Sequence, residues 1–374
     1  MARNRDSRVR LGIVGLGGIT EVAHMPSIVR SKKARLVAVC DIDKVRADKF
    51  ADKWKAPNVY YDMEEMVQRE DIDAIIVAIP TRHHRQAVEV AARAKKHILC
   101  EKPLATNLTD GESMIAVCRE NRVSLQVGFS ERFWNQSEIA KLLIAEGVIG
   151  TVYGYNATWN EKWGLFPAAT DYRYDLELSG GASILDLAIH RIDLARFLVG
   201  EIVRVCADIR HVAIPYKVDD NVWILCNFAN GGSGCISANR FSPGVSNPVE
   251  IYGTEGMLFL SLESFNPFHA VPMAVFTQKR PSELPDILNQ YYYPRNYWDK
   301  LGEDWISITP ERQSNFLKQI EAFCDCVLES QEPKVTGEDG LKALEVVMAA
   351  YQSVNEKGWV SLPLEQRVVD LPKY

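Results

Sequence analysis

The stretch that decides the fold is Val9–Thr20, which reads VRLGIVGLGGIT. Its first six residues form a mostly apolar run typical of a buried strand, and a glycine-rich turn leading into a helix follows at once. Such a turn lets the backbone approach a pyrophosphate closely, while the helix N-terminus supplies amide donors and a partial positive charge. We therefore expect Gly15, Gly17, Gly18 and Ile19 to bind a dinucleotide.

Short apolar runs alternate with amphipathic segments from residue 9 to residue 128, as in successive βα units. We expect strands at Val9–Val14, Leu36–Cys40, Ala74–Ile79, His97–Cys100 and Ser124–Val127. We expect helices at Lys44–Trp54, Met63–Arg69, His83–Ala94 and Asp110–Glu120. Right-handed crossovers favour a doubly wound parallel sheet, so residues 1–128 are predicted to form a Rossmann domain of an α/β protein.

The pattern changes after Gly128, where strand-like runs are separated by Asn, Gly and Pro turns. We expect strands at Val152–Trp159, Val203–Val212, Val222–Ala229, Gly234–Asn239 and Val249–Tyr252. We expect helices at Ser137–Glu146, Ser183–Val199, Arg312–Leu328 and Gly337–Asn355. Residues 129–374 are therefore predicted to form an α+β domain for substrate binding and oligomerisation, with a large, mostly antiparallel sheet and C-terminal helices.

Asp41 stands at the end of the second expected strand. A carboxylate there accepts hydrogen bonds from the adenosine ribose hydroxyls and repels a 2′-phosphate, so NAD is favoured over NADP as the cofactor. The alternative is that Asp41 caps the next helix.

Composition narrows the classes of function. The 374 residues include 43 Lys and Arg against 49 Asp and Glu, and no long basic run is present to neutralise a phosphate backbone, which disfavours nucleic acid as a partner. Neither a signal peptide nor a membrane-spanning segment is recognisable, so we expect a cytoplasmic protein. The eight cysteines are scattered without a CxxC spacing and are expected to be reduced, and no metal is expected.

Two segments could carry chemistry. Lys102, within Cys100–Pro103, follows an expected strand, where open α/β sheets place their ligands; the alternative is an ordinary solvated lysine. Asp186, His190 and Asp193 are spaced four and three apart and would form one polar stripe on an otherwise apolar helix. A histidine beside a carboxylate suits general-base catalysis, although a buried pair that satisfies itself is the alternative. Asp193 is expected to be structural and to bond to backbone or an arginine.

The sequence resembles the Gfo/Idh/MocA family, the relatives of glucose-fructose oxidoreductase and inositol dehydrogenase, from end to end. The residues that carry the resemblance are the Gly15–Thr20 turn, Ile79–His84 (IPTRHH), Val127–Phe133 (VGFSERF), Glu101–Pro103 (EKP), Gly180–Asp193, Ile251–Gly256 (IYGTEG) and Val335–Gly340 (VTGEDG). Thr20 stands where the family has a small glycine or alanine, and Ser130 where asparagine is commoner.

The resemblance implies that Lys102, Asp186 and His190 form the catalytic set. By this similarity, His190 takes or gives the alcohol proton, while Lys102 and Asp186 orient the hydroxyl and tune the histidine, and hydride moves to or from the nicotinamide. It further implies that the cofactor contacts Ile79, Pro80, Thr81, His84, Glu101 and Lys102.

Aromatic residues interleaved with hydrogen-bonding groups suggest a sugar site between residues 153 and 174, because a sugar has an apolar face and a hydroxylated rim. We expect Trp159, Lys162, Trp163 and Arg173, together with His190, to contact the substrate. A second aromatic cluster, Tyr291–Tyr293, Tyr297, Trp298 and Trp305, lies in a stretch from Leu262 to Ile308 that we expect to be irregular. This stretch would act as a lid or be buried against another subunit in a homodimer or homotetramer.

The function expected from the sequence is NAD-dependent hydride transfer between the nicotinamide and a secondary alcohol or ketone of a sugar, polyol or glycoside. One alternative is a redox-neutral enzyme that holds NAD tightly and oxidises a glycoside transiently, so as to eliminate or hydrolyse. Another is a non-catalytic nucleotide-sensing regulator, although that reading leaves the retention of Lys102, Asp186 and His190 without a reason.

Overall fold

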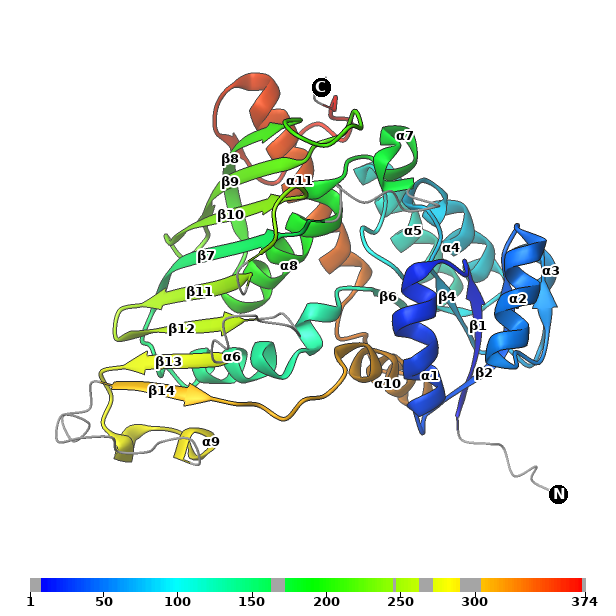
Figure 1. The fold of residues 1–374 in the computed structure, drawn as a ribbon, viewed down its shortest axis with the longest axis horizontal. Helices are drawn as coiled ribbons and strands as arrows, with labels where there is room; N and C mark the ends of the chain where they lie inside the picture. The colour runs from blue at the N-terminus through cyan, green and yellow to red at the C-terminus, as the bar shows by residue number, and fades with distance from the viewer. Residues whose placement is uncertain (1–7, 163–171, 245–246, 262–271, 290–303, 372–374) are drawn as a thin grey trace. The chain divides into compact units, whose positions relative to one another are not determined.

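The computed structural model describes residues 8–162, 172–244, 247–261, 272–289 and 304–371. The chain forms two compact units. The first combines Met1–Ser130 with Ser314–Leu344, and the second combines Glu131–Gln313 with Glu345–Tyr374. Each unit is built around a sheet of its own (Figure 1).

The first unit contains a parallel sheet with the strand order β3-β2-β1-β4-β5-β6. Its strands are β1 (Val9–Val14), β2 (Ala34–Cys40), β3 (Val59–Tyr60), β4 (Ala74–Val77), β5 (His97–Cys100) and β6 (Leu125–Val127). This order confirms the doubly wound prediction, and it places the point where the connections reverse direction between β1 and β4, which is where such sheets bind ligands.

Helices connect these strands, and three of them begin at side-chain caps that the sequence supplies. The helical elements are η1 (Thr20–His24), α1 (Met25–Arg30), α2 (Lys44–Trp54), α3 (Met63–Val67), η2 (Thr81–His83), α4 (His84–Arg93) and α5 (Leu108–Asn121). Asp43, Asp62 and Asn107 accept backbone N–H groups at the starts of α2, α3 and α5.

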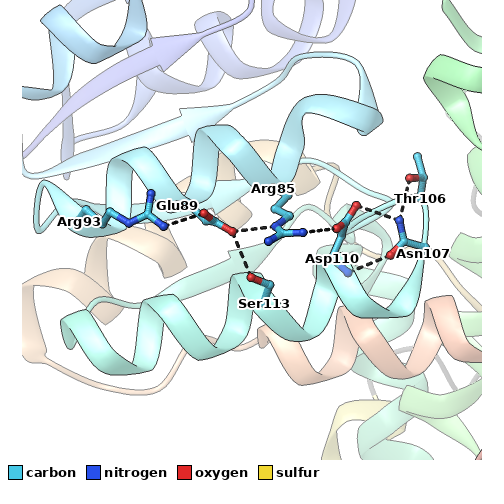
Figure 2. A network of polar contacts seen from close by, with 7 residues as sticks. All are labelled: Arg85, Glu89, Arg93, Thr106, Asn107, Asp110 and Ser113. Carbon is cyan, nitrogen blue, oxygen red and sulfur yellow. Dashed lines mark hydrogen bonds and ion pairs between the residues drawn. The ribbon is translucent and has the colours of Figure 1, made fainter. Parts of the chain in front are cut away.

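A polar network joins the outer surfaces of α4 and α5 (Figure 2). Arg85 donates to Glu89 one turn along α4 and to Asp110 on α5, both over 2.8 Å. Glu89 also accepts from Arg93 and from Ser113. Because both arginines are exposed, these ion pairs contribute little to the stability of the unit.

The helix α10 (Asn315–Glu329) belongs to the first unit, which differs from the predicted division at residue 128. Its Ile320, Phe323 and Cys324 are fully buried in the same hydrophobic cluster as Val9 and Leu11 of β1. The periodicity of α10 predicts a helix with an apolar face, but it does not say which sheet that face covers.

The second unit contains a nine-stranded sheet with the order β14-β13-β12-β11-β7-β10-β9-β8-β15. Its strands are β7 (Val152–Asn160), β8 (Ile202–Arg210), β9 (Asn221–Phe228), β10 (Ser233–Asn239), β11 (Pro248–Gly253), β12 (Gly256–Ser261), β13 (Met273–Thr277), β14 (Asp304–Ile308) and β15 (Val360–Ser361). Among the described strands of this second sheet, only the β7–β10 pair is parallel, so the prediction of a mostly antiparallel sheet is confirmed.

Helices pack against one face of this sheet, and the other face carries exposed apolar side chains. The helical elements are α6 (Asn135–Ala145), η4 (Tyr172–Tyr174), α7 (Leu176–Ser179), η5 (Ile184–Ala188), α8 (Ile189–Leu198), η6 (Pro281–Glu283), α9 (Asp286–Asn289) and the later part of α11 (Gly337–Glu356). Figure 1 shows α6 and α8 beside the sheet, where they contact β12 and β7 respectively. Side chains alternate along β9: Val222 and Ile224 are buried, whereas Trp223 and Leu225 point to the other face and are about half exposed.

The stretch from Leu262 to Ile308 is not irregular throughout, in contrast to the prediction. It contains β13 and β14, which extend one edge of the sheet, and the ring of Trp305 on β14 packs against Phe276 at 5.6 Å. The remaining aromatic residues of the cluster, Tyr291–Tyr293, Tyr297 and Trp298, lie outside the described residues.

Candidate active site

The glycine-rich turn follows β1 in a conformation that requires its first glycine. Gly15 has φ +91°, and a Cβ atom there would lie 2.3 Å from the carbonyl oxygen of Ala78. Apart from their chain neighbours, no described residue lies within 4 Å of a Cβ atom built at Gly17 or Gly18. The Thr20 hydroxyl, which stands at the departure from the family pattern, is buried and donates to the Gly15 carbonyl over 2.6 Å. The threonine therefore stabilises the turn itself.

Asp41 is tied to this turn. Its Oδ2 accepts the backbone N–H of Leu16 over 2.9 Å, and its Oδ1 accepts that of Asp43 over 2.9 Å. Arg46 lies 3.4 Å from Oδ2. Because Asp43 rather than Asp41 caps α2, the helix-cap alternative for Asp41 does not apply. The carboxylate lies directly after β2, next to β1 in the sheet, where an adenosine ribose binds in dinucleotide folds.

The predicted segment Ile79–His84 follows β4 at the same edge of the sheet. Ile79 and Pro80 are half-buried, whereas Thr81 and His84 are buried. The Nε2 of His84 lies 2.9 Å from the Ile79 carbonyl, and its Nδ1 lies 3.0 Å from the Pro103 carbonyl. Burial lowers the pKa of His84, against the opposing effect of the nearby carbonyls and Glu101. His84 therefore connects two segments that follow neighbouring strands.

Glu101 and Lys102 follow β5. Glu101 is 8% exposed, and its Oε1 lies 2.8 Å from Nε2 of His24, a residue that our sequence reading did not single out. Burial alone would raise the pKa of Glu101, but the His24 contact and the Lys102 charge hold it below its ordinary value. Lys102 is half-buried and donates its backbone N–H to Glu101 Oε2 over 3.2 Å.

In the second unit, Asp186 and His190 lie on consecutive helical elements. Asp186 belongs to the π-helix η5, and His190 lies in the first turn of α8. The predicted single α-helical stripe is therefore interrupted, because the π turn changes the angle between successive side chains. His190 is 6% exposed, and its ring packs against Trp159 of β7 with 4.9 Å between centroids.

Two arginines hold the Asp186 carboxylate. Nε of Arg173 lies 3.0 Å from its Oδ2, and Arg240, which is fully buried directly after β10, pairs with the same oxygen. A carboxylate beside two guanidinium groups is stabilised in its ionised form. Arg173 was expected to contact substrate, whereas Arg240 was not identified from the sequence.

Two further buried ion pairs join α8 to the segment that follows β6. Arg191 donates to both oxygens of Glu131 over 2.7 and 2.8 Å, and Arg132 donates to both oxygens of Asp193 over 2.6 and 2.8 Å. The expectation that Asp193 is a structural residue bonded to an arginine is confirmed. These pairs fix the helix that presents His190.

The other residues predicted to contact the substrate differ in their surroundings. Trp159 donates its indole N–H to Glu161 and has the Arg191 guanidinium 4.8 Å from its ring centroid. Lys162 is exposed, and Trp163 lies outside the described residues. Of these four predicted residues, Trp159 is thus placed against His190 and Arg173 against Asp186.

Comparisons with known proteins match both units. Residues 9–129 match the model of an oxidoreductase family with an NAD-binding Rossmann fold, and residues 138–259 match the GFO/IDH/MocA C-terminal domain. The chain belongs to the Gfo/Idh/MocA family. It is 30% identical to an uncharacterised oxidoreductase of Bacillus subtilis over 92% of this chain and 93% of that protein.

Two other proteins that this chain is similar to have more specific names. A myo-inositol 2-dehydrogenase of Thermotoga maritima is 28% identical over 95% of this chain and 98% of its own length. The crystal structure of an aldose-aldose oxidoreductase from Caulobacter crescentus, complexed with glycerol, superimposes with a TM-score of 0.80 at 25% identity, covering 95% of this chain and 100% of that one.

The residues at the edge of the first sheet fit the family's cofactor. Gly15 adopts the conformation that the turn requires, the Cβ positions of Gly17 and Gly18 are open, and the Asp41 carboxylate lies where it would accept hydrogen bonds from a ribose. The protein is an NAD-dependent oxidoreductase of the Gfo/Idh/MocA family.

The described residues offer neither a metal centre nor a membrane-spanning helix. They contain no group of three or more His, Cys, Asp or Glu side chains arranged to hold a metal ion. Nor does any helix among them combine the length and apolar character needed to cross a membrane.

Proposed function

We propose that the protein transfers hydride between NAD and a secondary alcohol or ketone of a sugar, polyol or glycoside. The observation that carries this proposal is the arrangement around His190: a nearly buried imidazole packed on Trp159, in the turn after a carboxylate held by two arginines. An imidazole titrates near neutral pH and suits proton exchange with an alcohol.

In this proposal His190 removes the proton from the substrate hydroxyl during oxidation and returns it during reduction. Lys102 donates to the substrate oxygen, and Asp186, ionised between Arg173 and Arg240, orients the hydroxyl and the imidazole. Bound NAD supplies the hydride acceptor at its nicotinamide. The proposal therefore requires Lys102 and His190 to act on the same substrate hydroxyl.

The relatives' names support a polyhydroxylated substrate. One is called an inositol dehydrogenase and another an aldose-aldose oxidoreductase. The flat face of Trp159 beside His190 also suits the apolar face of a sugar ring, and Arg173 supplies hydrogen-bond donors nearby. We propose that Trp159, Arg173, Lys162 and Trp163 contact the substrate.

The direct test is to incubate the protein with NAD and a panel of polyols, aldoses and glycosides, while recording the absorbance of reduced nicotinamide and analysing the products. Stoichiometric reduction of NAD with formation of a ketone supports the proposal. Products of elimination or hydrolysis without accumulation of reduced nicotinamide would instead show the redox-neutral reaction. Binding of NAD without any product would indicate a regulator.

We also propose that the protein is a cytoplasmic homo-oligomer that associates through the exposed face of the second sheet. Trp223, Leu225 and Tyr252 on this face are between 41% and 53% exposed. Light scattering should show a dimer or tetramer, and Leu225→Asp should lower the measured mass if this face is the interface.

A further inference from the structure

The segment that carries Lys102 is held by buried histidines from two different helical elements. His24, at the end of η1, contacts Glu101, and His84, at the start of α4, contacts the carbonyls of Pro103 and Leu104. His24 is fully buried, and its ring lies edge-on to Phe316 of α10 with 5.9 Å between centroids. Since η1 begins directly after the glycine-rich turn, His24 connects that turn to the lysine segment.

Both oxygens of Glu101 are used in this connection. Oε1 faces His24, and Oε2 accepts the backbone N–H of Lys102. A carboxylate is only an acceptor when ionised, so His24 donates from Nε2. The backbone of Gly128 also lies close to Glu101. A Cβ atom added at Gly128 would be 3.0 Å from Oε2 and 3.1 Å from the Cα of Glu101. The carboxylate therefore has little freedom to rotate, and its position sets that of the Lys102 backbone.

We propose that His24 is a positioning residue that acts through Glu101, setting the place of Lys102 relative to the cofactor turn. This inference rests on the proposed function of Lys102. A histidine that only filled the core would stabilise the unit without influencing the lysine, whereas the continuous path from the turn through η1, His24 and Glu101 to the Lys102 backbone links cofactor binding to lysine placement.

The first test measures turnover with the best alcohol substrate. His24→Ala should lower kcat about tenfold to a hundredfold, while the Kd for NADH and the KM for the alcohol change less than about threefold. His24→Gln should recover most of the loss, because its side-chain amide can donate from about the position of Nε2. In a Lys102→Ala background, His24→Ala should have almost no further effect, since the group on which it acts is absent.

A matched control is His97, which lies in β5, the strand that Glu101 and Lys102 follow. His97 begins β5, at the end opposite Glu101, and its Nδ1 accepts the backbone N–H of Ser124 over 3.1 Å. His97→Ala should destabilise the unit but leave kcat of the folded protein near that of the wild type. If His24→Ala and His97→Ala lower kcat equally, or if the effects of His24→Ala and Lys102→Ala multiply, the inference is wrong.

The second test does not depend on turnover. An amine-reactive reagent, followed by mass spectrometry, measures how fast Lys102 is acylated with and without NADH. NADH should protect Lys102 in the wild type and in His97→Ala, and protect it much less in His24→Ala at saturating NADH. Equal protection in His24→Ala overturns the inference even if the enzyme is active. If NADH fails to protect Lys102 in His24→Ala, and the wild type oxidises no alcohol, the inference is upheld and the proposed function is rejected.

Discussion

In the first unit, Asp41 and His84 at the candidate site contact mainly backbone groups and Glu101 contacts both His24 and the Lys102 backbone, whereas the carboxylates of the second unit's candidate site pair with arginines. Asp41 accepts two backbone N–H groups and His84 lies against backbone carbonyls. Asp186 and Glu131, in contrast, are held by arginine side chains. The first arrangement fixes loops at a sheet edge, and the second keeps charges ionised within an apolar environment. The two units should therefore respond differently to single substitutions.

The largest effect is expected for turnover when His190 of the second unit is replaced. His190→Ala should lower turnover by about two to four orders of magnitude, because the proposed general base is lost, while nucleotide affinity stays near that of the wild type. Steady-state kinetics measures turnover, and NADH titration measures nucleotide affinity. Normal turnover of the variant with its best substrate would show that the role assigned to His190 is wrong.

The next effect tests whether charge pairing stabilises the second unit. Arg191→Ala leaves Glu131 buried without its guanidinium partner and should lower the free energy of unfolding by about 3–5 kcal/mol. Urea denaturation measures the change. Arg210→Ala is the matched control, since Arg210 pairs with Asp208 in the same unit but is largely exposed, and it should leave the unfolding midpoint almost unchanged. Equal unfolding midpoints for both variants would show that the buried ion pair does not stabilise the second unit more than an exposed one does.

A smaller effect is expected at the sheet edge of the first unit. Asp41→Ala should weaken NAD binding by about tenfold to a hundredfold, because charge-assisted hydrogen bonds to the ribose are lost. Relative affinity for NADP should rise, since Arg46, 3.4 Å from the Asp41 carboxylate, can then contact a 2′-phosphate. The double variant Asp41→Ala/Arg46→Ala is the control. Unchanged discrimination between NAD and NADP in Asp41→Ala would contradict the role of Asp41.

The smallest effect concerns pH. Because burial lowers the pKa of His84 from its ordinary value of 6.5, the unfolded chain binds a proton at a higher pH than the folded chain does. The stability that His84 contributes is therefore present above about pH 6.5 and is lost as the pH falls toward the folded pKa. Thermal unfolding at several pH values should show a shallower acid limb for His84→Asn than for the wild type. His83→Asn, at the exposed neighbouring position, should keep the wild-type slope.

The contrast between the units also explains what could be predicted from the sequence. The bounds of β1, β5 and α2 were predicted without error, because strand runs and the helix period are local patterns. The cofactor turn and Asp41 follow from the same local order of strand, turn and strand. In contrast, Asp186 and Arg240 are 54 residues apart, and Arg191 and Glu131 are 60 apart, so no spacing rule connects them.

The strands β12, β13 and β14 were missed for a related reason. Met273–Thr277 and Asp304–Ile308 contain residues that favour strands, but each run is only five residues long, and each strand forms by pairing with a neighbour that is distant in the sequence or itself short. His24 was missed because nothing in its helix marks it; only its contact with Glu101, 77 residues later, shows what it does.

Because α10 belongs to the first unit but follows most of the second unit in the sequence, it affects the order in which the units fold during translation. The hydrophobic cluster around Val9 and Leu11 needs Ile320 and Phe323, which leave the ribosome only after most of the second unit has been made. The nucleotide-binding unit consequently cannot finish folding first, as an N-terminal domain ordinarily would. A fragment that ends at residue 130 would expose this cluster and aggregate, so an isolated nucleotide-binding unit has to include residues 314–344.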